Sequence, residues 1–302
     1  MKQAAERLKQ AVGAGIFLTD EPMSRHTTFR TGGPADIYIE PSGVEELKQV
    51  LDICREENVA YTIIGNGSNL LVGDGGYRGV LISFGKPFAQ VTIEEAQVRT
   101  GAGALLSAVA KQVLNASLTG FEFAAGIPGT IGGAVVMNAG AYGGELCQVL
   151  REATVLTPEG EVKTLPAEEL ELGYRTSCVQ KNGYIVLEAV LQLQPGNADD
   201  IRAVMDALAS KRREKQPLEY PSAGSTFKRP EGHFAGRLIQ DAGLRGFRVG
   251  GAQVSEKHCG FVINRDHATS ADILSLCRQV QEKVKAQFGV ELELEVKLLG
   301  EF

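Results

Sequence analysis

The residues with the clearest potential for chemistry are the glycines of one long uncharged stretch. Residues 123–144 contain no charged side chain, and seven of these 22 positions are glycine. Glycine lets the backbone approach a ligand closely, and successive N–H groups in turns form a nest that binds anions. Residues 126–133 can therefore either wrap a phosphate-bearing ligand or form tight turns beneath a hydrophobic core.

A second glycine loop favours the first of these alternatives. It reads Gly65-Asn66-Gly67-Ser68-Asn69-Leu70 and follows a β-branched and aromatic run at residues 61–64. The loop departs from the dinucleotide fingerprint because its sixth position is Leu70 and no helical pattern follows, so a Rossmann fold is disfavoured. Two such loops, each after an apolar run, indicate one elongated ligand held at two points, such as a dinucleotide.

Beyond these loops, the sequence contains only scattered polar residues near turns. It has no HExxH motif and no GxSxG motif, which disfavours hydrolases and metalloproteins; no metal site is predicted. Taken singly, each of these residues is better explained by a structural or solvated role than by a catalytic one: Arg175, Ser225, Lys228, His258 and Glu295. The residues alone indicate an α/β protein with a phosphate-bearing cofactor and nothing more specific.

Composition narrows the class of protein. The chain has 302 residues, enough for two or three domains, and a net charge of −6, which gives no general attraction to nucleic acid or anionic membranes. Its five cysteines are widely spaced, which favours a reduced, cytoplasmic chain. The first twelve residues predict an amphipathic helix rather than a signal peptide, and we expect no membrane insertion. The oligomeric state is left open.

Around the loops, the pattern predicts alternating strands and helices. One unit precedes the first loop and consists of a strand at 36–39, a helix and a strand at 61–64. The helix is opened by Ser42, with Glu45 in capping-box spacing. A second unit begins near Val91, with a helix at about 105–114, a hairpin around residues 158–160 and a strand at 185–193. A helix at 199–216 leads to the predicted domain boundary, marked by Pro217 and Pro221.

The C-terminal part should contain strands at 251–254 and 260–264 and a long helix capped by Thr269 and Asp272. The last strand, 290–299, alternates strictly, with Leu292, Leu294, Val296 and Leu298 facing inward. Glu291, Glu293 and Glu295 share the opposite face, and period 2 alone cannot distinguish them.

Six ordered motifs carry a resemblance to a known family: GNGSNLLV, GIPGTIGGAVVMNAGAYG, YRTS, AGSTFKRP, KHCGFVIN and LELEVKLLG. From about His26 to Gly300 the chain closely resembles the UDP-N-acetylenolpyruvoylglucosamine reductase family, which also bears the name UDP-N-acetylmuramate dehydrogenase. The resemblance is to the shorter, second type, because the tyrosine-bearing insert of one branch is absent. It implies an α+β protein of the vanillyl-alcohol-oxidase type. The implied domains are two FAD-binding subdomains (1–90 and 91–205) and a C-terminal substrate-binding domain (206–302).

The resemblance also implies roles for individual residues. FAD would be bound by the two glycine loops, and non-covalently because neither contains His or Cys. The implied FAD contacts are Gly65, Asn66, Gly67, Ser68, Asn69, Leu70, Gly126, Ile127, Pro128, Gly129, Thr130, Gly132, Gly133 and Ala134. Ser225 is implied as the proton donor, with Arg175 and Glu295 on the side of the substrate carboxylate. Tyr142, Tyr174, Lys228 and His258 are the implied contacts to the UDP-sugar.

The implied reaction uses NADPH as co-substrate and reduces UDP-N-acetylglucosamine-enolpyruvate for peptidoglycan synthesis. One departure is that many members read FKNP where this chain has Arg229 before Pro230. Two alternatives stay open: an oxidase or dehydrogenase of small alcohols or hydroxy acids on the same flavin fold, and a non-catalytic nucleotide-sugar binding protein. The first would not need Ser225, Arg175 and Glu295 together, and the second would be colourless.

Overall fold

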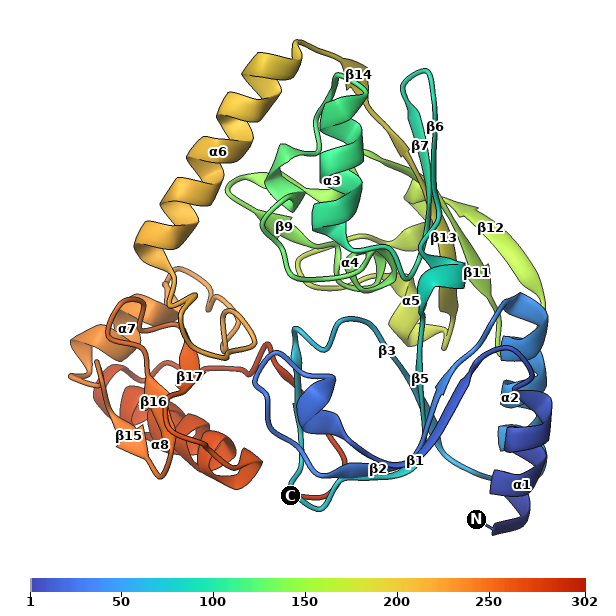
Figure 1. Ribbon diagram of the computed structural model, residues 1–302. Coiled ribbons are helices and arrows are strands. Elements are labelled where there is room, and N and C mark those ends of the chain that lie inside the picture. The colour runs from blue at the N-terminus through green and yellow to red at the C-terminus, as the bar shows by residue number, and fades with distance from the viewer. Residues whose placement is uncertain (1) are drawn as a thin grey trace. The chain divides into compact units, whose positions relative to one another are not determined.

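A computed structural model describes residues 2–302 (Figure 1), and the chain divides into two compact units. Unit 1 contains the chain before Leu18 together with residues 39–66 and 81–211. Unit 2 contains residues 18–38, 67–80 and 212–302. The first glycine loop is divided between them, since Asn66 belongs to unit 1 and Gly67 to unit 2.

The larger sheet of unit 1 has five strands in the order β12-β11-β13-β7-β6, and all neighbours are antiparallel. The strands are β6 (Val91–Glu94), β7 (Gln97–Gly101), β11 (Leu150–Leu156), β12 (Val162–Pro166) and β13 (Ile185–Gln192). Two helices, α3 (Leu106–Asn115) and α4 (Ile131–Met137), contribute to the same core (Figure 1). Fully buried members of this core include Val109 of α3 and Val135 of α4.

A second sheet has four strands in the order β1-β2-β5-β3. Its strands are β1 (Ile16–Pro22), β2 (Pro34–Glu40), β3 (Tyr61–Ile64) and β5 (Tyr77–Ser83), and the chain passes from one unit to the other within β1, β2 and β5. The helices α1 (Lys2–Ala11) and α2 (Val44–Glu56) both belong to unit 1. Four apolar residues of α2 are buried: Leu47, Val50, Leu51 and Cys54.

Unit 2 is built around a three-stranded antiparallel sheet and a long helix. The sheet consists of β15 (Arg248–Val249), β16 (Ala252–Val254) and β17 (Val262–Asn264), and the helices are α7 (Ala235–Asp241) and α8 (Ser270–Phe288). In addition, β4 (Leu70–Val72) pairs in parallel with β18 (Lys297–Leu299). The remaining elements are β8 (Leu118–Thr119), β9 (Gly140–Ala141), β10 (Gly144–Glu145), β14 (Gln194–Pro195), α5 (Cys178–Lys181) and α6 (Ala198–Lys215), together with short 3-10 turns.

Of the two predicted helix caps, one is confirmed and one is wrong. Thr269 Oγ1 accepts from the Asp272 N–H at 3.0 Å, and the Asp272 carboxylate accepts from the Thr269 N–H at 3.1 Å, which completes a capping box. Ser42, in contrast, does not cap α2. Gly43 is the N-cap, no side chain caps the helix, and the Ser42 hydroxyl donates to the carboxylate of Glu46.

The final segment is less regular than its alternation predicts. A strand forms only at Lys297–Leu299, and Leu294 makes an isolated bridge to Phe227. The apolar face is largely confirmed, since Leu292 and Val296 are buried, although Leu298 remains 43% exposed. The opposite face is not uniform, because Glu295 is only 9% exposed whereas Glu291 and Glu293 are exposed.

Candidate active site

The two glycine loops contact each other within unit 1. The Asn66 side-chain amide donates to the Pro128 carbonyl at 2.8 Å. A Cβ at Gly65 would lie 2.6 Å from Thr130 Oγ1, so a side chain at this position would have to displace the Thr130 side chain. Glycine at this position lets the two loops lie close together, and glycine backbone of this kind allows close approach to a phosphate-bearing cofactor. These residues fit a dinucleotide such as FAD.

The glycine stretch contains a helix that the sequence analysis did not predict. α4 begins after Thr130, whose hydroxyl accepts from the Gly133 N–H at 3.4 Å, and it ends at Asn138 in the left-handed conformation (φ 43°). Asparagine adopts this conformation more readily than most residues, so Asn138 after an apolar run was the signal for a helix end.

Asn138 connects three segments of unit 1. Its side-chain amide donates to the Gly173 carbonyl at 3.2 Å and to the Glu145 carboxylate at 3.1 Å, while its Oδ1 accepts from the Cys147 N–H at 2.9 Å. The residue is only 2% exposed. Because Gly173 begins the turn that carries Arg175, Asn138 ties this turn to the end of α4.

Arg175 lies at the tip of a tight turn in the left-handed conformation (φ 56°). The Gly173 and Thr176 backbones bond to each other across the turn, with N···O distances of 3.1 and 3.4 Å. The Arg175 guanidinium carbon lies 5.3 Å from the centre of the Tyr174 ring, and Tyr174 is 54% exposed. Tyr142, also predicted for substrate binding, lies in unit 1 with φ 55° and 47% exposure. Strained backbone of this kind is typical of functional sites.

In unit 2, the second half of the first glycine loop is packed against the segment that follows β1. A Cβ at Gly67 (φ 59°) would lie 1.9 Å from the His26 carbonyl oxygen, so only glycine fits. The Thr28 N–H donates to the Gly67 carbonyl at 3.2 Å. Further along the loop, the Asn69 amide donates to the Glu295 carbonyl at 3.0 Å, and the Lys297 N–H donates to the Asn69 carbonyl at 2.9 Å. The predicted cofactor loop is thus bonded directly to the segment that carries Glu295.

Ser225 and Glu295 are brought together through one intervening residue. Thr226 follows Ser225, and its carbonyl accepts from the Glu295 N–H at 2.9 Å. Ser225 itself is exposed, whereas Thr226 is 1% exposed. The structure therefore places an exposed hydroxyl and a buried carboxyl on two bonded segments of the same unit.

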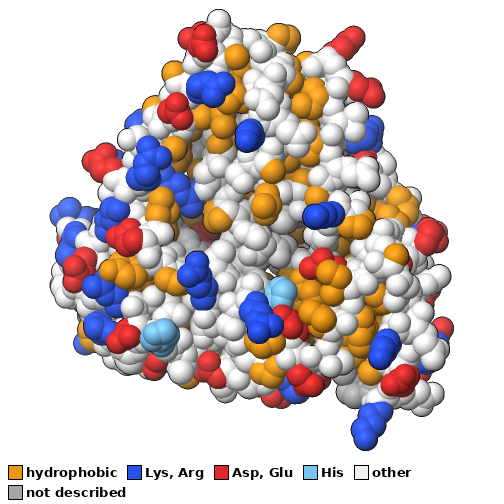
Figure 2. All heavy atoms as spheres, in the orientation of Figure 1, with side chains coloured by type: hydrophobic (Ala, Val, Ile, Leu, Met, Phe, Trp, Pro, Cys, Tyr) orange, Lys and Arg blue, Asp and Glu red, His pale blue; other side chains and the backbone are white. Residues whose placement is uncertain are grey.

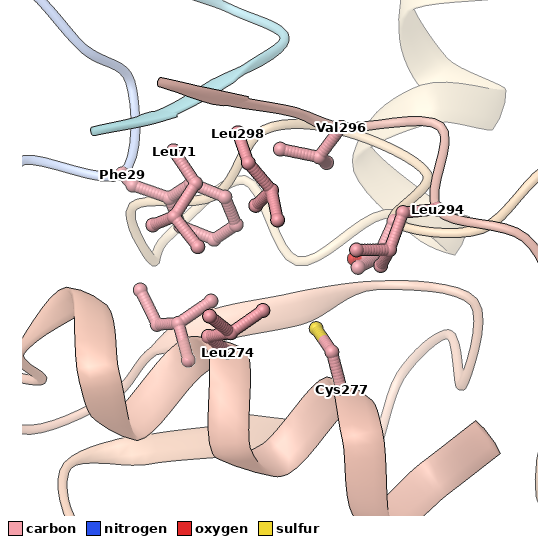
Figure 3. Close-up of a pocket in the computed structure, with 9 residues that line it drawn as sticks. Phe29, Leu71, Leu274, Cys277, Leu294, Val296 and Leu298 are labelled. Carbon is pink, nitrogen blue, oxygen red and sulfur yellow. The ribbon is translucent and has the colours of Figure 1, made fainter. Parts of the chain in front are cut away.

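Apolar neighbours explain why Glu295 stays in place (Figure 3). Leu294 and Val296 line a hollow, with Leu71 and Phe29 on the same side and Leu274 and Cys277 of α8 below. Leu294 and Val296 pack on the unit 2 core and hold the segment there, and Glu295 between them is 9% exposed. This hollow is apolar and has no room for a water molecule, so it is packing rather than a ligand site.

Lys228 and Arg229 have clear partners in unit 2. The Lys228 ammonium donates to the Glu293 carboxylate at 2.8 Å, and this hydrogen bond lowers the pKa of Glu293. Arg229 places its guanidinium carbon 4.0 Å from the centre of the Phe234 ring and donates to the His233 carbonyl at 3.4 Å. Both cations are thus engaged on the loop that follows Ser225.

His258 is held as a neutral ring. Its Nδ1 accepts from the Gly260 N–H at 3.1 Å, which leaves the proton on Nε2. Burial lowers the pKa of His258, because the charged form is poorly solvated there. The ring packs edge-on against Phe261 at 5.0 Å between centroids.

Over the face shown in Figure 2, basic and acidic side chains are interspersed. Such a distribution fits local recognition of a phosphate rather than a general attraction for polyanions. Within residues 2–302, no cluster of three or more His, Cys, Asp or Glu residues is arranged to hold a metal ion. Nor does any helix in that range have the length and apolarity needed to cross a membrane.

Comparison with known proteins defines the class first. Residues 35–166 match the model of an FAD binding domain. Residues 216–299 match the C-terminal domain of UDP-N-acetylenolpyruvoylglucosamine reductase. The fold is therefore an FAD-binding fold of the vanillyl-alcohol-oxidase type with a C-terminal α+β domain, as predicted. A berberine-bridge-enzyme-like protein of Physcomitrella patens shares this fold alone, with a TM-score of 0.50 and 18% identity over 62% of this chain and 44% of that one.

Relatives identify the family. The UDP-N-acetylenolpyruvoylglucosamine reductase of Agathobacter rectalis is 55% identical over 314 residues, covering 100% of this chain and 98% of the relative. The protein of the same name from Clostridioides difficile is 53% identical over 282 residues, 93% of each chain. The crystal structure of the reductase from Thermus caldophilus superposes with a TM-score of 0.81 at 35% identity, covering 94% of this chain and 98% of that one. The chain belongs to the UDP-N-acetylenolpyruvoylglucosamine reductase family, whose members are FAD-containing oxidoreductases.

Proposed function

We propose that this chain is an NADPH-dependent flavin reductase that converts UDP-N-acetylglucosamine-enolpyruvate to UDP-N-acetylmuramate. The support is the reductase name borne by relatives more than half identical along nearly the whole chain. The product is a peptidoglycan precursor, so the enzyme would act in the bacterial cytoplasm in cell wall biogenesis and, through it, in cell shape, the cell cycle and division. The three-domain division at residues 90 and 205 remains part of the proposal.

FAD is held without a covalent bond by the loops at residues 65–70 and 126–134. When bound, FAD would supply the redox chemistry that carries a hydride from NADPH to the β-carbon of the enolpyruvyl group. Gly65 and Gly67, where a side chain would collide with Thr130 or with the His26 carbonyl, keep the backbone open to the cofactor. The Asn66 amide keeps the two loops in contact through the Pro128 carbonyl.

Arg175 and Glu295 act on the substrate carboxylate. Hydride addition at the β-carbon builds enolate character on this carboxylate, and stabilising developing charge is a major source of catalysis. The guanidinium of Arg175 offers a fixed cationic fork that suits a carboxylate. Glu295 acts beside the same group, on the segment whose N–H is bonded to Thr226.

Ser225 donates the proton to C2. A positioned acid over this carbon completes the addition. The observation that carries the assignment is the bond between the two segments: Thr226, the neighbour of Ser225, accepts from the N–H of the buried Glu295. A serine hydroxyl is a weak acid, so its alkoxide needs a nearby cation. Lys228 can stabilise this alkoxide only when its hydrogen bond to the Glu293 carboxylate is broken.

Four further residues complete the proposed UDP-sugar site. Tyr142 and Tyr174 are exposed aromatic side chains that can pack on a base or sugar ring and donate a hydroxyl. Lys228 supplies a cation for the diphosphate, and His258 supplies an Nε2–H donor.

Removal of the Ser225 hydroxyl tests the role assigned to it. In Ser225→Ala, anaerobic flavin reduction by NADPH should stay near the wild-type rate. Flavin reoxidation by the enolpyruvyl sugar should slow by about 10²- to 10⁴-fold, the usual contribution of a general acid. Ser222→Ala, three residues upstream, is the matched control and should leave both rates unchanged. Equal slowing of the two half-reactions in Ser225→Ala would refute the role.

A further inference from the structure

Ser225 follows Gly224, whose φ of 74° lies in the left-handed region. Before this glycine, Ala223 is 4% exposed in the unit 2 core, and Ser222 forms a backbone bridge to Ile263 of β17. On the other side of the exposed Ser225 lies Thr226, which is 1% exposed. Thr226 is thus the immediate neighbour of Ser225 whose side chain can form hydrogen bonds.

Thr226 is bonded on three sides inside unit 2. Its N–H donates to the Gly260 carbonyl, and its own carbonyl accepts from the Glu295 N–H, both at 2.9 Å. The third bond uses the side chain, because Thr226 Oγ1 accepts from the Val262 N–H of β17 at 2.9 Å. Thr226 and Val262 are each 1% exposed, so water cannot replace this acceptor.

Glu295 depends on the same residue. Its N–H is bonded to Thr226, and its carbonyl accepts from the Asn69 amide at 3.0 Å. Both polar groups of its backbone are thus satisfied by partners far away in the sequence. A shift of Thr226 away from β17 would move Ser225 through the chain and Glu295 through the hydrogen bond.

We propose that Thr226 is a positioning residue of the reaction: its hydroxyl, bonded to the Val262 N–H, sets where the Ser225 hydroxyl and the Glu295 carboxyl are presented to the substrate. The inference rests on the proposed function and adds a residue to it. A buried N–H that loses its acceptor must move or stay unpaired, and either outcome displaces the two side chains. Displacements of about 1 Å cost on the order of a hundredfold in rate for oriented reactants.

Thr226→Val tests the proposal, since valine has nearly the same shape but no acceptor. The measurement is the anaerobic rate at which the enolpyruvyl UDP-sugar reoxidises flavin that NADPH has reduced. We expect this rate to fall by about tenfold or more while the NADPH step stays within about twofold of wild type. Thr226→Ser restores the oxygen and should return reoxidation to within about threefold of wild type.

Val280→Ala is the matched control for stability. Val280 is fully buried in the same core, and its side chain forms no hydrogen bond to either segment of the site because it is apolar. This variant should lower the Tm as much as Thr226→Val but leave reoxidation unchanged. If Thr226→Val does not fold, Thr226→Ala removes the same oxygen with a smaller side chain and carries the same expectation.

Three results would overturn the proposal: reoxidation in Thr226→Val within about twofold of wild type, no recovery in Thr226→Ser, or equal slowing in Val280→Ala. Failure of the proposed function is distinguishable, because wild-type flavin reduced by NADPH would then never be reoxidised by the enolpyruvyl sugar. That result removes the role of Thr226 together with the reaction.

Discussion

Replacement of Asn138 is expected to weaken both unit 1 and the turn that carries Arg175. Asn138→Gly keeps the left-handed backbone (φ 43°) but deletes the bonds to Gly173, Glu145 and Cys147. At about 1 kcal/mol for each neutral hydrogen bond and somewhat more for the bond to a carboxylate, the loss is about 3 kcal/mol in the free energy of unfolding. Asn138→Ala should lower the free energy of unfolding by about 1 kcal/mol more than Asn138→Gly, because a Cβ disfavours the left-handed region.

The assay has a structural and a functional part. Urea unfolding followed by circular dichroism gives the stability of each variant, and the oxidative half-reaction with the enolpyruvyl sugar reports on Arg175. With the Gly173 carbonyl released, we expect that rate to fall by about tenfold. Asn182→Gly is the matched control: it replaces an exposed asparagine at the end of α5 (φ −93°) and should change little.

Two results would refute the reasoning. If Asn138→Gly unfolds within about 0.5 kcal/mol of the control, the three hydrogen bonds contribute nothing net. If it loses stability yet reacts with the sugar at the wild-type rate, Asn138 does not position Arg175.

Two further predictions follow from pKa values. Because burial lowers the pKa of His258 below its ordinary value of 6.5, the unfolded chain takes up this proton first; its contribution to stability is full above pH 6.5 and is lost as pH falls below it. His258→Asn keeps an acceptor for the Gly260 N–H but does not titrate. In this variant the free energy of unfolding should vary less with pH between pH 5 and 7, about the range where histidine titrates. An unchanged dependence of that free energy on pH would contradict this. Burial also raises the pKa of Cys54 to about 11 and that of Cys277 to about 12, whereas Cys147 is exposed. A thiol reagent at neutral pH should therefore label Cys147 first in the native protein and all five cysteines in urea, and rapid native labelling of Cys277 would contradict the structure.

Periodicity predicted much of the fold but could not locate Glu295. Local apolar patterns predicted regular helices such as α2. The spacing of Thr269 and Asp272 predicted the capping box of α8. Glu295 shares its predicted face with Glu291 and Glu293, but it is 9% exposed and its backbone is bonded to Asn69 and Thr226, which are distant in sequence. No local pattern carries that information.

The helix α4 was missed for a different physical reason. Gly132 and Gly133 have poor helix propensity, so no helix was predicted in this segment. Ile131, Ala134 and Val135 bury their side chains in the unit 1 core, and this packing outweighs the local preference. The same glycines that conceal the helix suggested an accessible backbone, which is why the segment was predicted to bind a cofactor and its helix was missed.

The most direct test of the central claim is the visible spectrum of the purified protein. It is followed anaerobically, first on addition of NADPH and then on addition of UDP-N-acetylglucosamine-enolpyruvate. The account predicts a yellow protein that bleaches with NADPH and recovers its colour with the enolpyruvyl sugar. A protein that stays colourless after incubation with FAD, or one that bleaches and never recovers with this sugar, would contradict it.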